Sequence, residues 1–206
     1  MPRRATVRSK GSGRGRSEVH LAWHSLVEPG LEIVTLARDG DRLVADGRAL
    51  RFSRGITHAI NWRIECDRDW RTRAATVWPT GGNEPLVAAD CNGRGLWTVR
   101  QGRARDRIAG CIDVALAGGP YSHTLPIRRL ELDVPGQEVR VRVALVDPVK
   151  RTLAPARRSY TLLESLVAGR LFRYRDLDAG TTAELVVDDF GLVQDHPGQF
   201  RMVWCA

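Results

Sequence analysis

The chain has 206 residues, 43% hydrophobic and 27% charged, a balance typical of a soluble globular protein with room for a core in one domain. Its net charge is +8, but residues 1–16 carry +6 and leave 26 basic and 24 acidic residues for the rest of the chain. No apolar run of about 18 residues occurs, which excludes a membrane-spanning helix.

The first segment, residues 1–17, is basic and rich in glycine, and we predict a disordered tail followed by a single domain over 18–206. An alternative interpretation of its cations is a weak contact with nucleic acid or an anionic membrane. No apolar stretch of the signal-peptide kind follows, so we expect a cytoplasmic protein. The widely spaced cysteines also fit a reducing compartment, with Cys66 and Cys111 as small buried residues.

Alternation of apolar and polar residues predicts strands along most of the chain. It is clearest over 56–66, where His58, Trp62 and Ile64 share the apolar face, and over 138–147. Weaker alternation covers 31–37, 71–78, 96–100, 108–114, 171–175 and 182–188. Turn dipeptides such as Asp39-Gly40, Asp46-Gly47 and Asn92-Gly93 separate the runs. Short strands at this spacing indicate an antiparallel barrel, roll or sandwich.

Two segments are predicted to be helical. Over 124–130, Thr124 is the expected cap, Pro126 fits the first turn, and Ile127 and Leu130 share a face. Over 161–168, an apolar run ends at Gly169, a typical residue after a helix.

The histidines do not form a recognisable metal site. His20 and His24 lie four residues apart without a third ligand, so we expect no metal and no cofactor. His58 is interpreted as a core histidine, because it lies on the apolar face of its strand. His196 is interpreted as a loop residue, because Pro197 and Gly198 follow it.

The segment 110–130 is the most informative part of the chain. It places Asp113, His123, Arg128 and Arg129 among apolar residues. Two adjacent arginines cannot both enter a core unpaired, because each guanidinium would lose its water. At least one must therefore face solvent, a carboxylate or an anionic group of a ligand. One interpretation is a buried ion pair of Asp113 with Arg128.

Tryptophans supply a second candidate feature. Trp62, Trp70 and Trp97 lie on or beside predicted strands, where they would either line an apolar pocket or fill the core. The segment 67–73 brings Trp70 close in sequence to Arg73, which makes this arginine a further candidate for a ligand contact.

These residues resemble the family named putative glycolipid-binding, a group of bacterial proteins, over about 32–201. The most specific match is the string Leu-Pro-Ile-Arg-Arg-Leu at 125–130, supported by the Asp-x-x-Trp-x-x-Arg pattern at 67–73 and the Gly-x-Trp pattern at 95–97. Ala115, Ser122 and His123 depart from the family pattern.

The resemblance implies a mainly β protein: a curled antiparallel sheet, a spiral β-roll or open barrel, wrapped around one helix. Such a fold is similar to the bacterial lipoprotein-localisation carriers, whose open barrels hold acyl chains. The implied function is non-enzymatic binding of a glycolipid or another amphiphilic small molecule, with its apolar chain on the concave face of the sheet. We expect head-group contacts from Arg128, Arg129 or Arg73, orientation by His123 and Asp113, and wall or stacking surface from Trp70 and Trp97.

Two alternatives remain open from the sequence. One is a small hydrolase-like enzyme in the same pocket, with His123 and Asp113 as acid and base. The other is an interaction module with a filled core, because a curled sheet either holds a ligand or is filled by its own side chains.

Overall fold

The alternating segments form one continuous curled sheet. The computed structural model describes residues 18–53, 56–104 and 108–206, and the predicted basic tail with its proposed partners lies outside them. The strands are β1 (Glu18–Ser25), β2 (Gly30–Asp39), β3 (Arg42–Ser53), β4 (Ile56–Asp67), β5 (Thr72–Pro79), β6 (Val87–Cys91), β7 (Trp97–Gln101), β8 (Arg103–Ala104), β9 (Asp113–Leu116), β10 (Glu138–Asp147), β11 (Thr152–Leu166), β12 (Gly169–Asp176), β13 (Thr181–Val187), β14 (Val193–His196) and β15 (Phe200–Cys205).

The strand order runs from β7 back to β1, then from β15 back to β9, with β1 paired to β15. Neighbours are antiparallel except β9 on β10 and the short β8 on β11, which are parallel. In the described part of the chain, β7 and β9 end this path without pairing to one another, so the sheet stays open. The predicted fold class, a mainly β protein with a curled antiparallel sheet around one helix, is confirmed.

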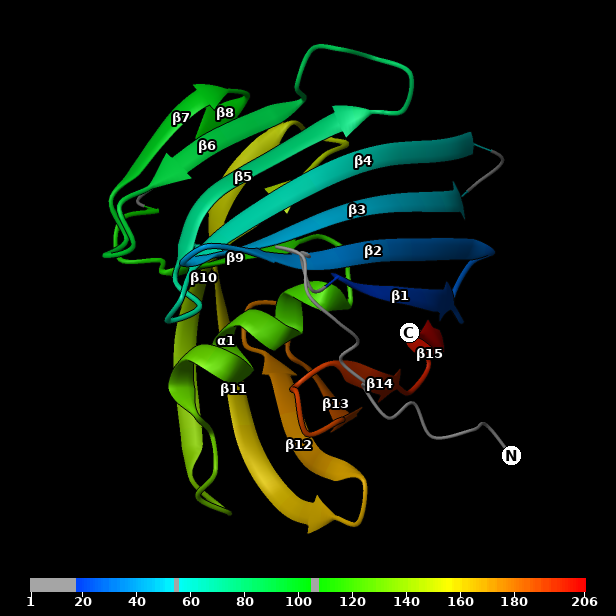
Figure 1. The fold of residues 1–206 in the computed structure, drawn as a ribbon, viewed down its shortest axis with the longest axis vertical. Coiled ribbons are helices and arrows are strands. Elements are labelled where there is room, and N and C mark those ends of the chain that lie inside the picture. Colours follow the sequence, from blue (N-terminus) through cyan, green and yellow to red (C-terminus); the bar gives the residue numbers. More distant parts are fainter. Residues whose placement is uncertain (1–17, 54–55, 105–107) are drawn as a thin grey trace, which may run out of the picture.

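The helix α1 (Thr124–Leu130) follows a 3-10 turn, η1 (Tyr121–His123), and lies on the concave side of the curl (Figure 1). Its Leu125 packs in the cluster that contains Trp62 and Tyr121, while Ile127 packs in a second cluster with Tyr160 and Phe172. The helix therefore joins the two halves of the core. In the described residues, no helix is long and apolar enough to cross a membrane.

The helix prediction over 124–130 is confirmed, although its first residue differs in role. His123 rather than Thr124 is the capping residue, and it makes no side-chain cap hydrogen bond. Because η1 leads directly into α1 with helical backbone angles, the exposed end that Thr124 would cap does not exist there.

The helix prediction over 161–168 is wrong, because this segment lies at the end of β11 and in the turn that follows it. Leu162 pairs with Phe172 of β12, and Leu166 pairs with Gly169, which closes the hairpin at a φ of 131°. Pairing with β12 outweighs the local helix preference of this leucine-rich run.

Two further expectations need correction. Asp46-Gly47 is not a turn but the middle of β3, opposite Arg63 and Trp62 of β4. The strand predicted over 108–114 starts only at Asp113, because a turn at 108–111 precedes it, with Gly110 at a φ of 84°.

The predicted strands over 56–66 and 138–147 are confirmed as β4 and β10. Cys66 and Cys111 are buried and free, as expected.

Candidate functional site

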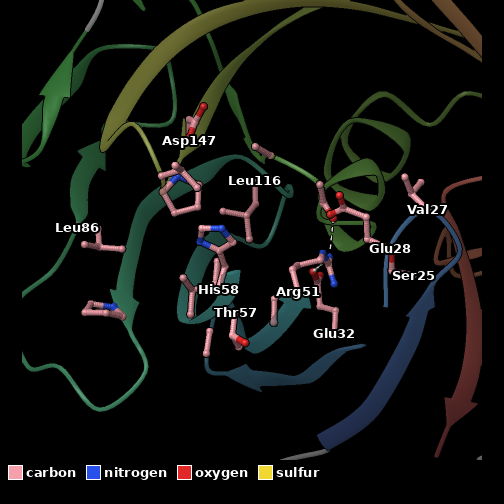
Figure 2. A pocket seen from close by; sticks show the side chains of 18 of the residues that line it. Ser25, Val27, Glu28, Glu32, Arg51, Thr57, His58, Leu86, Leu116 and Asp147 are labelled. Carbon is pink, nitrogen blue, oxygen red and sulfur yellow. Dashed lines mark hydrogen bonds and ion pairs between the residues drawn. The ribbon is translucent and has the colours of Figure 1, made fainter. Parts of the chain in front are cut away.

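A hollow at one end of the roll has a volume of about 650 Å³. We call it the large pocket. Figure 2 shows Leu86 towards one side of its lining, Val27 and Glu28 towards the other, and His58, Leu116 and Arg51 between them. Its volume falls in the range of about 300 to 1,000 Å³ that is typical of small-molecule sites. Apolar residues make up much of its wall: Val27, Ala49, Ile60, Leu86, Leu116, Val149 and Phe200.

The inner face of β3 carries a run of small residues, of which Ala49 lines this pocket. Ala45, Gly47 and Ala49 succeed one another along that face, and all three are buried. Ala49 lines the pocket opposite Ile60 of β4. The small side chain of Ala49 leaves this end of the curl open, whereas Trp62, packed against Gly47, and Tyr121 fill the interior further along.

An ion pair between a half-buried arginine and a buried carboxylate lies in the wall of the large pocket. Arg51 Nη2 donates to Glu32 Oε2 at 3.1 Å and to the carbonyl oxygen of Gly118 at 2.7 Å, and its guanidinium lies 5.1 Å from the centre of the Phe200 ring. Only 1% of the Glu32 side chain is exposed. Burial raises the pKa of Glu32 to about 7, and the charge of Arg51 opposes that rise.

His58 contributes to this wall as well. It lies on the inner face of β4, as expected, but it is half-buried and lines the large pocket. The interpretation as a core histidine is therefore wrong. The reason is that the interior opens into the pocket at this end of β4.

A second hollow of about 320 Å³, the small pocket, adjoins the large one. The two share Leu116, Gly118, Gln199 and Phe200 in their linings. The remaining residues of the small pocket are mostly polar: Gly119, His123, Arg158, Tyr174, Asp176, Thr181, Thr182, Ala183, His196 and Pro197. The two pockets together offer an apolar space continuous with a polar one.

Two histidines form the centre of the small pocket. His123 Nδ1 lies 2.9 Å from the hydroxyl of Tyr160, and the His123 ring lies 5.5 Å from that of His196 and 4.7 Å from that of Tyr174. Burial lowers the pKa of His123 well below its usual value and that of His196 to about 4, and the charge of Arg158 lowers both further. His196 ends β14 and is buried, so its interpretation as a loop residue is wrong: Phe200 pairs with it across the turn.

The structure pairs Asp113 with Arg129 rather than with Arg128. Arg129 Nε and Nη2 donate to the two carboxylate oxygens of Asp113, each at 2.8 Å, and Asp113 is fully buried. Burial raises the pKa of Asp113, while Arg129 opposes the rise. Arg128, one position earlier on α1, instead lies against two aromatic rings, 5.4 Å from the centre of Trp70 and 4.9 Å from that of Phe190.

The other predicted residues, Trp70, Trp97 and Arg73, line neither pocket. Trp70 is buried and Trp97 is half-buried, with its Nε1 donating to the carbonyl oxygen of Cys111 at 2.7 Å. Arg73 is exposed and donates to the carbonyl oxygen of Asn92 at 2.8 Å. Of the seven predicted site residues, all of which the structure describes, His123 alone lines either pocket.

Sequence reasoning missed Glu32, Arg51 and Arg158. Each lies on the face of its strand that carries buried apolar residues: Glu32 with Val34 and Leu36, for example. A charged residue in the buried phase of an alternating run is therefore the signal that could have found them. In the part of the chain that the structure describes, no three His, Cys, Asp or Glu side chains are grouped to hold a metal ion.

Comparisons with known proteins agree with this architecture. A family model described as "Putative glycolipid-binding" matches residues 20–202. A solved crystal structure of a DUF1089 family protein from Pseudomonas aeruginosa is similar, with a TM-score of 0.68 and 27% sequence identity, covering 95% of this chain and 99% of that one. The comparison with curated proteins gives no match.

Proposed function

Since the chain belongs to the putative glycolipid-binding family, we propose that it binds a glycolipid or related amphiphile and holds the apolar chain in the large pocket. The observation that carries this proposal is the pocket itself: a hollow of about 650 Å³ whose wall is largely apolar. Transfer of an apolar chain from water into such a wall is favourable by roughly 25 cal/mol for each Å² buried.

The geometry favours binding over the enzyme alternative. Both oxygens of Asp113 accept hydrogen bonds from Arg129, and Nδ1 of His123 lies against Tyr160. An acid–base pair of His123 and Asp113 would need these partners to separate. The interaction-module alternative, in turn, assumed a filled core, and a hollow of this size argues against it.

The first experiment changes the volume of the large pocket. Ala49→Phe adds a ring to the inner face of β3, and Leu50→Phe, a matched control, alters an exposed side chain at the next position. We expect Ala49→Phe to weaken binding of decyl maltoside at least about tenfold, equivalent to about 1.4 kcal/mol, and Leu50→Phe to leave it unchanged. The measurement is displacement of the neutral fluorophore N-phenyl-1-naphthylamine.

Equal affinities of both variants for decyl maltoside would mean that the apolar chain of the ligand binds elsewhere, which would contradict the proposal. Native mass spectrometry of protein purified from its own host gives an independent test. A co-purifying lipid mass that disappears in Ala49→Phe and persists in Leu50→Phe supports binding in the large pocket.

A further inference from the structure

We propose that the small pocket is an oxyanion site, in which Arg158 binds the phosphate or carboxylate of an anionic head group with help from His196 and Tyr174. This inference rests on the proposed function and narrows it to amphiphiles that carry a negative charge. Neutral glycolipids would fill the large pocket alone.

The first argument is the state of Arg158. Its side chain lies on the inner face of β11, between Ala156 and Tyr160, and only 7% of the residue is exposed. Among residues 18–53, 56–104 and 108–206, no carboxylate forms an ion pair with it, and its buried Nε has no hydrogen-bond partner there. Asp176 of β12 lies directly across from Arg158 but forms no ion pair with its guanidinium. Because a buried guanidinium has lost its water, an anion that contacts it directly would offset that cost.

Its neighbour Arg157 shows the ordinary alternative. Arg157 points outwards from the same strand and binds Asp178, with Nε 2.6 Å from Oδ1. Another inward arginine, Arg129, is neutralised by Asp113. Of these three arginines, Arg158 alone lines a pocket.

The second argument is the set of groups around Arg158. Its guanidinium carbon lies 5.8 Å from the centre of the Tyr174 ring, and Nδ1 of the buried His196 has no hydrogen-bond partner among the described residues. Thr181 and Thr182 also line the pocket. A guanidinium beside imidazole and hydroxyl groups can donate several hydrogen bonds to an oxyanion and neutralise its charge.

The remaining charged and titratable groups are compatible with this role. Asp176 also lines the pocket, and its Oδ1 accepts the backbone N–H groups of Asp178 and Ala179 in the β12–β13 turn. His123 and His196 are held neutral by burial and by Arg158, so each still offers one N–H donor at pH 7. Burial raises the pKa of both Tyr160 and Tyr174, which keeps their hydroxyls protonated.

The third argument is the position of the small pocket. It shares four lining residues with the large pocket, namely Leu116, Gly118, Gln199 and Phe200. One ligand can therefore place its apolar chain in the large pocket and its charge beside Arg158.

The test compares two twelve-carbon ligands, dodecyl phosphate and neutral dodecyl glucoside, and inorganic phosphate alone, by calorimetry at pH 7. We expect the wild-type protein to bind dodecyl phosphate at least about tenfold more tightly than dodecyl glucoside. Arg158→Met should abolish this preference without changing the affinity for dodecyl glucoside. The matched control Arg157→Met, on the opposite face of the same strand, should keep the preference.

The outcomes separate the two proposals. Equal affinity of wild-type protein for both ligands overturns the oxyanion site but leaves amphiphile binding intact. Binding of inorganic phosphate, lost in Arg158→Met, without binding of either amphiphile supports the oxyanion site and refutes the proposed function. If Arg158→Met does not fold, the wild-type preference decides the result, and Arg158→Lys, which keeps the charge but not the planar fork, should reduce that preference.

Discussion

At the scale of single residues, the inward-facing charges differ in how they are satisfied. Arg129 is paired with the carboxylate of Asp113, one of the three environments that the sequence allowed for these arginines: solvent, a carboxylate or an anionic ligand group. Arg128 instead lies against the aromatic rings of Trp70 and Phe190, an environment outside those three. Aromatic rings attract a guanidinium while still burying its stem, so these contacts stabilise Arg128 without a carboxylate.

This difference predicts unequal effects on stability. Arg129→Met leaves Asp113 buried without its partner and should cost about 3–5 kcal/mol, whereas Arg128→Met loses a cation–π contact and should cost about 1 kcal/mol. Urea unfolding of both variants measures the losses. Adding Asp113→Asn should restore much of the stability of Arg129→Met. Equal losses, or no rescue, would contradict the pairing. The expectation that one of the two arginines contacts ligand stays a prediction.

Glu32 predicts a pH dependence. Its pKa is raised from 4.5 to about 7, so between these values the native state keeps a proton that the unfolded chain releases. The stabilising contribution is complete below pH 4.5 and is lost as the pH rises through 7, at up to about 1.4 kcal/mol per pH unit. Glu32→Gln should therefore gain stability relative to wild type across this window and show a constant difference above it.

Urea unfolding at a series of pH values measures this difference. His196 titrates in an overlapping window, with the opposite sign because its pKa is lowered to about 4, but it is common to both proteins and cancels. Glu164→Gln, at an exposed position, serves as the control. A difference between Glu32→Gln and wild type that does not change with pH would refute the assignment.

At the scale of elements, β3 shows that a glycine can mark either a turn or a strand position opposite a large side chain. Asp46-Gly47 has the composition of a turn, yet Gly47 lies in mid-strand, where a Cβ would collide with Cε2 of Trp62. The glycine provides space for the indole, which stacks on Tyr121 at 5.6 Å. Composition alone cannot separate a turn glycine from one that admits a large neighbour.

The close approach predicts the effect of Gly47→Ala. The added methyl group displaces Trp62 and should destabilise the fold by about 1–3 kcal/mol. In a Trp62→Leu background the same substitution should cost much less, because the indole it collides with is gone. Thermal or urea unfolding of the four proteins gives the coupling. Equal costs in both backgrounds would show that the clash is not the cause.

At the scale of the whole molecule, the open sheet and the helix α1 divide the interior into filled and hollow parts. Leu125 and Ile127 of α1 join the two core clusters, while the pockets are lined by residues of other segments together with His123 of η1. The large pocket draws residues from loops and strands between Ser25 and Phe200. A site assembled from such distant segments has no local sequence motif.

The sequence by itself determined what depends on near neighbours. Alternation at a period of two predicted β4 and β10, the apolar spacing after Pro126 predicted α1, and the motif at 125–130 indicated the family. These patterns are readable because successive side chains of a strand or helix take fixed directions. The wrong helix at 161–168 marks the limit, since partner strand β12 decided that segment.

Only the tertiary structure decided which charges meet and where the interior stays hollow. Arg51 donates to Gly118 across 67 positions, and the choice of Arg129 over Arg128 as the partner of Asp113 depends on how α1 is rotated over β9. The sequence predicted the candidate site at the arginines of α1, whereas the pockets are lined by Arg51 and Arg158 of the strands. The physical reason is that burial and pairing are set by contacts between distant segments, which no local period records.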